Sequence, residues 1–387
     1  MKILHYTGAY APAWKVGGPV RSVSQICEGL AARGHEVTVF PTNVELDSDP
    51  MIIPGQVMDR NGVEVTYFQA ERNWTGVRSS GLEAAVRERI NEFDIVHVTG
   101  VWQPTSMAAC RAAESAGVPY VVSPRGALGD YSWTQKRWKK YPYWWLFERR
   151  NCSAAAAVHY TTTMEAQECV RFKLPGEVAL IPNSVGLDFW RYDHEAAQAW
   201  RAEQGISAKT RVFLNAGRLH HKKGLDLLPA ALAEVECSNW KMVFVGSDDD
   251  HTKEELINEF GRVGLLGRII FLDTLTPEVL RGLYSAADVF LLPSRHENFG
   301  NVAIEALACG CPLIISEHVG VAADLIEYPG VTVLPNDGSK WAQAISLAEA
   351  AKDRLDLACR LEQCFSRHVV VGKFEEIYIN LLANLRT

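Results

Sequence analysis

The chain of 387 residues lacks the features that mark several large classes of protein. No apolar run reaches the roughly 18–20 residues needed to cross a bilayer. The start, Met1–Tyr6, is too short and mixed for a signal peptide and reads better as a strand. A formal net charge of −7 gives no sign of a nucleic-acid partner. Solenoid-length repeats and low-complexity tracts are also missing.

Cysteine is sparse and unpatterned. The nine cysteines form no CxxC pair, which suggests reduced thiols and a cytoplasmic setting. Cys309 and Cys311 flank Gly310, but no histidine or third cysteine follows at metal-ligand spacing. We therefore expect buried structural thiols there.

Short β-rich runs alternate with longer helical patterns, which indicates parallel sheets covered by helices on both faces. The expected strands are Ile3–Tyr6, Val37–Phe40, Ile95–Val98, Tyr120–Ser123 and Ala156–Tyr160, then Val212–Ala216, Lys241–Val245, Ile269–Leu272, Val289–Leu292, Leu313–Ser316 and Val331–Leu334.

The alternation pauses over residues 185–208, a charged and aromatic stretch without a strand signal, so we place a domain boundary there. We expect an α/β protein of two doubly wound, Rossmann-like domains, 1–187 and 205–369, facing a central cleft. The helix over about 370–387 is expected to pack back on the first domain. Ligands of such sheets bind at the carboxyl ends of the strands.

The first chemical motif is 216-AGRLHHKKGLD-226, which follows a strand. Gly217 permits a tight turn, and Arg218 and Lys223 project from the loop before a helix expected near Gly224. Two cations beside a helix N-terminus suit a diphosphate. A solvated basic loop is the plainer interpretation of the motif alone. It is not a GxxxxGK[ST] loop.

The second motif is 293-PSRHENFGNVAIEALACGCP-312, with two glutamates eight residues apart. Glu297 lies in a loop, and residues 299–302 are expected to form the first helical turn, where backbone N–H groups lack internal partners. Glu305 shares a helix face with Asn301. Two carboxylates can accept hydrogen bonds from the hydroxyls at both ends of a sugar nucleotide. The alternative is one capping glutamate and one solvated or paired glutamate.

Two weaker signals complete the survey. Gly17 and Gly18 precede Pro19 after the first strand, so the backbone there can approach a ligand closely. The run Asp248–Asp250 contains a DxD pattern of the kind that can hold a hard cation. We interpret it as a solvated loop or helix start and expect no metal.

Together these residues resemble the retaining GT-B glycosyltransferases of family 4. The resemblance spans about the whole chain. It is carried by Gly217-Arg218-Leu219 with Lys223-Gly224, by Glu297 and Glu305 eight residues apart, by Gly17-Gly18, by 33-RGHEVTVF-40, and by 181-IPNSV-185, in which Ser184 replaces the usual glycine.

The resemblance implies roles for single residues in donor binding. Arg218 and Lys223 would hold the diphosphate, Glu297 would contact the donor sugar, and Glu305 would bind the ribose. The base would lie near Leu275. The sugar and phosphate would also meet residues of the glutamate loop, namely Asn298, Phe299, Gly300 and Asn301, and Gly18 would line the donor site.

A first-domain histidine of the family is replaced here by Arg125, which cannot act as a base at neutral pH but can stabilise charge on the departing phosphate or orient the acceptor. A carboxylate-paired surface arginine is the plainer reading. The family mechanism is retention without an established protein nucleophile and without a required cofactor or metal.

The acceptor side is expected around 131-YSWTQKRWKKYPYWWLFERR-150, where cations and aromatics interleave. Such a composition suits an anionic lipid interface, and hence a polyprenyl-diphosphate-linked acceptor and peripheral contact with the inner membrane face. An ordinary helix with aromatics on the core is the alternative. Lys136 and Trp102 are candidate acceptor-side residues.

The function expected overall is transfer of a hexose, with UDP-glucose as the first choice of donor, to a glycan or lipid-linked glycan in exopolysaccharide biosynthesis. Two other classes remain open: a sugar-nucleotide epimerase or phosphorylase on the same scaffold, and a non-catalytic nucleotide-sugar sensor. The released product distinguishes the enzymes, since a transferase slowly releases UDP from the donor and an epimerase releases an epimerised nucleotide sugar.

Overall fold

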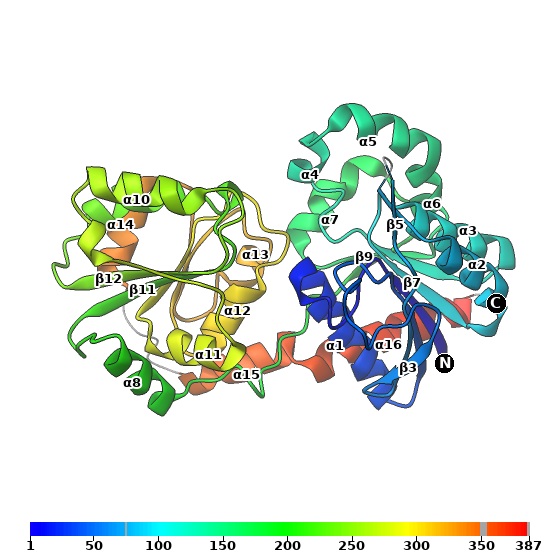
Figure 1. Ribbon diagram of the computed structural model, residues 1–387, viewed down its shortest axis with the longest axis horizontal. Helices are drawn as coiled ribbons and strands as arrows, with labels where there is room; N and C mark the ends of the chain where they lie inside the picture. The colour runs from blue at the N-terminus through cyan, green and yellow to red at the C-terminus, as the bar shows by residue number, and fades with distance from the viewer. Residues whose placement is uncertain (74–75, 349–353, 385–387) are drawn as a thin grey trace. The chain divides into compact units, whose positions relative to one another are not determined.

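The computed structural model describes residues 1–73, 76–348 and 354–384 and divides the chain into two compact units (Figure 1). One unit is Met1–Ser184 with Arg367–Thr387, and the other is Val185–Ser366. Each unit is built on its own sheet of mainly parallel strands, which confirms the predicted fold class of two Rossmann-like domains. Over the described residues, the structure contains no helix that is both apolar and long enough to cross a bilayer.

The sheet of the first unit has eight strands in the order β10-β9-β8-β7-β1-β2-β4-β3, parallel except for the β3–β4 hairpin. The order changes direction at β1, with β2 on one side and β7 on the other. The strands are β1 (Lys2–Thr7), β2 (Glu36–Phe40), β3 (Val57–Arg60), β4 (Val63–Thr66), β7 (Ile95–Thr99), β8 (Tyr120–Ser123), β9 (Ala157–Tyr160) and β10 (Glu177–Leu180), with a separate ribbon of β5 (Glu71–Asn73) and β6 (Gly76–Arg78).

The helices of the first unit include one from the far end of the chain. They are α1 (Gly18–Ala32), α2 (Ser80–Arg89), α3 (Pro104–Ala116), α4 (Asp130–Thr134), α5 (Arg137–Tyr143), α6 (Arg149–Ser153), α7 (Thr163–Cys169) and α16 (Arg367–Asn384). Helix α16 lies beside α1 and buries Val370, Phe374 and Tyr378 in the same core (Figure 1). Residues 385–387 of the expected terminal helix lie outside the described residues.

The sheet of the second unit has six parallel strands in the order β13-β12-β11-β14-β15-β16. The strands are β11 (Arg211–Ala216), β12 (Trp240–Val245), β13 (Ile269–Leu272), β14 (Val289–Leu292), β15 (Leu313–Ser316) and β16 (Val331–Leu334). The helices are α8 (His194–Glu203), α9 (Leu228–Ala233), α10 (Thr252–Arg262), α11 (Pro277–Ala286), α12 (Asn301–Ala308), α13 (Ala322–Leu325), α14 (Gly338–Leu347) and α15 (Arg354–Phe365).

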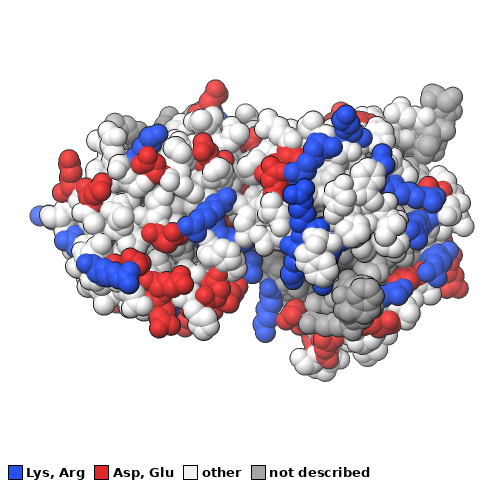
Figure 2. All heavy atoms as spheres, turned by 90° about the horizontal axis from the view of Figure 1, so that it is seen from above, with Lys and Arg blue, Asp and Glu red and all other residues white. Residues whose placement is uncertain are grey.

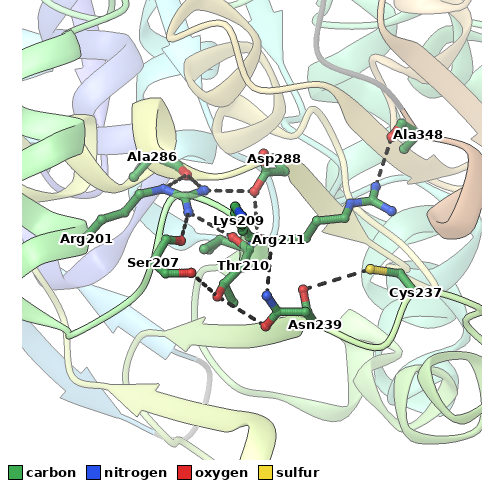
Figure 3. A network of polar contacts seen from close by, with 11 residues as sticks. Arg201, Ser207, Lys209, Thr210, Arg211, Cys237, Asn239, Ala286, Asp288 and Ala348 are labelled. Carbon is green, nitrogen blue, oxygen red and sulfur yellow. Dashed lines mark hydrogen bonds and ion pairs between the residues drawn. The ribbon is translucent and has the colours of Figure 1, made fainter.

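The second unit begins at Val185, twenty residues before the start expected at residue 205, because α8 is part of it. Figure 3 shows the polar contacts that hold this helix. Arg201 donates to the carbonyl oxygen of Ala286 at 2.7 Å, to that of Thr210 at 2.8 Å, and to Asp288 Oδ2 at 2.8 Å. Asp288 Oδ2 also accepts the N–H of Val212, the second residue of β11, at 2.7 Å. One arginine therefore fastens α8 to the start of the sheet.

Three histidines lie fully buried in the first unit, on β1, β7 and β9. His97 contacts the Tyr378 hydroxyl at 2.5 Å through Nδ1, and His97 Nε2 and His159 Nδ1 each contact Ser123 Oγ at 2.6 Å. His5 stacks on His97 with ring centroids 4.5 Å apart. Burial lowers the pKa of His97 and His159 well below the usual value and lowers that of His5 to about 3. All three rings are therefore neutral in the folded protein.

We predict that the first unit loses stability as the pH falls from about 6.5 toward 3. In this window the unfolded chain protonates the histidines, whose ordinary pKa is about 6.5, and the folded protein does not. Each group lowers the free energy of unfolding by up to about 1.4 kcal/mol per pH unit. Glu148 opposes them, because burial raises its pKa to about 7. Urea unfolding at pH 7 and pH 5 measures the net effect.

The matched comparison is His97→Gln against His368→Gln, which changes an exposed histidine on α16. His97→Gln is expected to reduce the dependence on pH, and His368→Gln is expected to leave it unchanged. Equal pH dependence in wild type and His97→Gln would show that the buried histidines are not its source.

Candidate active site

The strand order of the second unit reverses between β11 and β14, and the loops that follow these two strands lie at the same edge of the sheet. In open α/β sheets this switch point at the carboxyl ends is where ligands bind. Residues 217–224 form the first loop and residues 293–300 form the second. The first loop contains Arg218 and Lys223, and the second contains Glu297. The topology of the sheet therefore brings together residues of two motifs that lie far apart in the sequence.

Direct contacts fasten the two loops to one another. The N–H of Arg295 donates to the carbonyl oxygen of Lys222 at 2.8 Å, and Arg295 Nη1 donates to that of His221 at 2.8 Å. Gly224 has φ 61°, and a Cβ there would lie 2.2 Å from the carbonyl oxygen of Pro293. Only glycine fits this close approach. The first loop contains a 3₁₀ turn at His221–Lys223, and a second 3₁₀ turn follows it at Leu225–Leu227. The regular helix α9 therefore starts at Leu228, later than expected.

An ion pair between Lys223 Nζ and Glu297 Oε2 crosses from one loop to the other. Both side chains are mostly shielded, with 17% and 27% of their surfaces exposed. Burial alone would raise the pKa of Glu297, but the Lys223 ammonium and its hydrogen bond, together with Lys222 and His296, lower it below its usual range. Glu297 is therefore ionised at neutral pH and can accept hydrogen bonds from hydroxyl groups.

Arg218 lies on the same loop and is held less tightly. Its Nη1 is 3.3 Å from Asp249 Oδ2, and 72% of its side chain is exposed. Exposed ion pairs of this kind contribute about 0–1 kcal/mol, so an incoming anion can displace the aspartate at little cost.

Helix α12 begins at Asn301, two residues later than the expected start at Phe299. Gly300 is its N-cap at φ 98°, and no side chain caps the helix. Phe299 is buried and packs against Phe365, so its backbone rather than its ring is available to a ligand. Asn298 and Asn301 are half-buried. The uncapped first turn presents backbone N–H groups, as expected for a site that takes an anion or a hydroxyl.

Two further donor-side candidates belong to the same unit. Glu305 lies one turn into α12 and is buried to 5% exposure. Leu275 follows β13 and packs half-buried against the core that contains α8 and α12. The roles of both residues stay predictions.

The candidates of the first unit lie after β1, β7 and β8. Gly18 opens α1 and is exposed, with Pro19 in the first turn as predicted. Trp102 has φ 70°, donates Nε1–H to the carbonyl oxygen of Ala127 at 2.9 Å, and packs among other aromatic rings. Lys136 is exposed at φ 53° before α5.

Arg125 follows β8 and is not the carboxylate-paired surface arginine of the plainer reading. Its Nη1 donates to Asn183 Oδ1 at 2.5 Å, while Nε and Nη2 are buried and have no hydrogen-bond partner among the residues that the structure describes. Burial lowers its pKa to about 10, against the attraction of Glu165, so it stays charged at neutral pH. Unpartnered buried donors are costly, and an anion would satisfy them.

The sequence did not single out the residues that hold Arg125. Glu165 is buried on α7, accepts the N–H of Gly126 at 2.5 Å, and accepts the N–H and hydroxyl of Thr161, both at 2.8 Å. It thereby fixes the loop in which Arg125 adopts φ 54°. Asn183 lies in the sequence motif 181-IPNSV-185, and its place in this family-like motif was the one feature of the sequence that could have indicated it.

Comparisons with known proteins agree over both units. Residues 17–184 match the glycosyl transferase 4-like domain, and residues 196–360 match glycosyl transferases group 1. A D-inositol 3-phosphate glycosyltransferase of Rhodococcus opacus is 31% identical over 360 residues, which cover 88% of this chain and 79% of the relative. An uncharacterized glycosyltransferase of Methanocaldococcus jannaschii is 27% identical over 357 residues, 88% of this chain and 87% of the relative.

Solved structures share the fold. Sucrose-phosphate synthase from Thermosynechococcus elongatus has a TM-score of 0.76 at 21% identity, covering 99% of this chain and all of that one. Anabaena HepE in complex with UDP-glucose has a TM-score of 0.72 at 19% identity, covering 98% of this chain and all of that one. With the two matched domains and the Rhodococcus relative, these findings place the chain among the group 1 glycosyltransferases of the GT4 type, which have the GT-B fold.

Proposed function

We propose that the protein transfers a hexose, with retention of configuration, from a UDP-sugar to a glycan or lipid-linked glycan, and that UDP-glucose is the donor in exopolysaccharide biosynthesis. The observation that carries the proposal is the ion pair of Lys223 with Glu297 at the strand reversal of the second unit, with Arg218 on the same loop as Lys223. HepE, which shares the fold, is known in complex with UDP-glucose. That choice of donor for this chain is our inference.

The charges of the site fit the reaction. Breaking a sugar–phosphate bond leaves positive charge on the anomeric carbon and negative charge on the nucleoside diphosphate. Arg218 and Lys223 would stabilise the diphosphate, and one preorganised contact of this kind is worth about 3–4 kcal/mol. The backbone N–H groups at the start of α12 would add to it. With these positive groups in place, we propose that the transfer itself needs no metal ion.

Glu297 would contact the hydroxyls of the hexose. In the free protein it neutralises Lys223, so neither charge is left uncompensated. When a donor binds, Lys223 gains a phosphate as partner, and the carboxylate can accept hydroxyl hydrogens. Glu305 would bind the ribose, and Leu275 would lie beside the base.

Arg125 would provide a further contact to an anion, through Nε and Nη2. A guanidinium cannot remove a proton at neutral pH, so its role is to stabilise negative charge or to orient the acceptor. Glu165 and Asn183 would act as positioning residues for it.

The segment 131–150 suits an acceptor held at an anionic lipid surface. Its exposed residues include Trp138, Tyr141, Trp145 and Leu146, exposed by 74%, 52%, 54% and 69%. Its one acidic residue, Glu148, is buried. Figure 2 looks down on the side where α5 lies and shows Lys and Arg side chains gathered around uncharged surface. Exposed tryptophans among cations are typical of membrane-interface segments.

A donor screen tests the proposed function. We expect UDP-glucose and UDP to raise the midpoint of thermal unfolding more than the corresponding GDP, ADP and dTDP compounds, because a ligand of the folded state stabilises it. We also expect slow release of UDP and glucose. Release of an epimerised nucleotide sugar would establish the epimerase instead, and no shift with any nucleoside diphosphate would refute the donor site.

Lys223→Met and Glu297→Gln should each lower kcat/KM at least tenfold, for different reasons. Lys223→Met removes a phosphate contact and is expected to weaken UDP binding in calorimetry. Glu297→Gln removes a sugar contact and leaves Lys223 free, so UDP binding should be retained or improved.

The control for these variants is Arg262→Met, which removes an exposed cation on α10. Its turnover should match wild type. Wild-type turnover in both site variants, with the fold intact by circular dichroism, would refute the roles of Lys223 and Glu297.

Arg125→Met is expected to lower kcat at least tenfold without lowering stability. The variant removes two unsatisfied buried donors, each of which costs about 1–3 kcal/mol. Thermal unfolding and steady-state kinetics give the two readouts. A variant that is destabilised yet turns over normally would mean that Arg125 is a structural residue only.

Binding to vesicles tests the lipid surface. The protein should float with vesicles of phosphatidylglycerol but not of phosphatidylcholine. Lys136→Glu/Lys139→Glu should weaken this binding at least tenfold, since each basic residue near an anionic surface contributes about 1 kcal/mol. The control Lys209→Glu/Lys340→Glu changes the net charge equally at exposed positions of the second unit. Equal loss of vesicle binding in both double variants would show that only the net charge matters, and it would refute the proposed lipid-binding surface.

A further inference from the structure

Two histidines and an aspartate meet beside the donor loops. His220 and His221 lie on the loop after β11, and Asp250 lies on the loop after β12. Each residue offers one ligand atom, and all three atoms lie within 4.8 Å of one another. In the sequence, Asp250 stands out only as part of the acidic run 248–250, because nothing there shows that the two loops lie side by side.

The spacing of these atoms fits a small tetrahedral ion. Asp250 Oδ2 lies 2.9 Å from His221 Nδ1 and 3.6 Å from His220 Nε2. A zinc ion with bonds of about 2.0–2.1 Å holds neighbouring tetrahedral ligands about 3.3 Å apart. Both distances from Asp250 Oδ2 lie within a few tenths of an ångström of this value, and the two histidine nitrogens lie within 4.8 Å of each other, so rotation of the side chains would bring all three residues onto one ion.

The aspartate is held in place by other groups. Thr252 Oγ1 donates to Asp250 Oδ1 at 2.5 Å, and the backbone N–H of His221 donates to Oδ2 at 3.0 Å. Outer contacts of this kind orient a metal ligand and raise its affinity. The loops themselves are joined, since the N–H of Leu219 donates to the carbonyl oxygen of Ser247 at 2.7 Å. The frame of the cluster is thus built by the fold.

We propose that His220, His221 and Asp250 form a binding site for a divalent ion of the zinc class, Zn²⁺, Co²⁺ or Ni²⁺, with an outer position left for water. Imidazole nitrogens favour these ions over Mg²⁺ and Ca²⁺, which prefer oxygen. The side chains are 27%, 60% and 26% exposed, so an ion has access from solvent. Binding through Nε2 requires the His220 ring to carry its proton on Nδ1, so His220 gives up the 3.2 Å hydrogen bond that Nδ1 accepts from the N–H of Lys222.

The site is separate from the transfer reaction proposed above. The ion ties the loop after β11 to the loop after β12, and its expected effect is to stabilise the loop that carries Arg218 and Lys223. Metal binding can therefore be measured without donor or acceptor, and it can succeed or fail independently of the glycosyltransferase proposal.

Cobalt titration of the untagged, chelator-treated protein tests the site. We expect one Co²⁺ per chain with the intense visible bands of a tetrahedral nitrogen–oxygen site and without a sulfur charge-transfer band. Zn²⁺ should displace it, and Mg²⁺ in large excess should not. In calorimetry, His221→Ala and Asp250→Asn should each weaken Zn²⁺ binding at least tenfold. Asp250→Asn keeps one oxygen to accept the backbone N–H of His221, and its NH2 group can donate to the Thr252 hydroxyl, which guards against a folding defect.

The matched control is His251→Asn, which changes the histidine adjacent to Asp250, outside the cluster, to a residue that tolerates its left-handed backbone at φ 64°. Its Zn²⁺ affinity should equal that of wild type. The proposal is overturned if wild type binds no Co²⁺, if a thiolate band appears, or if the affinity survives both ligand replacements.

Discussion

The ion pair between Lys223 and Glu297 is the interaction on which the second unit's site depends. It joins loops that follow β11 and β14, the two strands at which the sheet order reverses. Neither charge could be buried alone at an acceptable cost, because a lone buried ion has lost its water without gaining a partner. Gly224 permits the approach, since any Cβ there would collide with Pro293. The pair thus keeps a cation and an anion side by side, as the proposed donor site requires.

The first unit follows a different principle, in which buried polar groups are held by one another. His97, Ser123 and His159 form a chain of hydrogen bonds that reaches α16 through Tyr378. Burial is the main cause of the low pKa of His97 and His159, and the positive charge of Arg125 lowers it further. The charged arginine therefore helps to keep both histidines neutral. The unsatisfied Nε and Nη2 donors of Arg125 cost free energy, so the surrounding fold must hold the side chain in place. Glu165 on α7 does this by accepting the N–H of Gly126, the residue after Arg125. Unsatisfied groups that persist in a structure tend to mark functional sites.

Much of this was predictable from the sequence. The alternation of strands and helices gave both sheets, because buried parallel strands are continuous apolar runs such as Val289–Leu292. The donor motifs were identified through their resemblance to a known family, since a solvated basic loop was the plainer interpretation of the first motif alone. The hairpin of β3 and β4 was missed, since each face of Val57–Arg60 combines one apolar and one charged residue and so gives no alternating pattern. Helix α8 was missed although the sequence carries local signals for it, since Asp193 is its N-cap and Ala197 and Trp200 form its buried face. The stretch was interpreted as a domain boundary because it has no strand signal.

The limits of prediction at the site have the same cause. Contacts between distant segments accompany the start of α12 at Asn301, since the carbonyl oxygen of Phe299 accepts the N–H of Val321 at 3.0 Å and Gly300 is the N-cap at φ 98°. They also created the His220–Asp250 cluster from two loops that a linear pattern treats separately. Residue types and spacing thus indicated the chemistry, while topology determined which groups meet.

The central claim is that the loops after β11 and β14 hold a nucleoside diphosphate through Arg218 and Lys223. A crystal structure of the protein with UDP tests it most directly. We expect diphosphate oxygens about 3 Å from Lys223 Nζ and from the Arg218 guanidinium. We also expect Glu297 to have left Lys223 and to point toward the position of the sugar. A diphosphate bound elsewhere on the chain, with the Lys223–Glu297 pair unchanged, would contradict it.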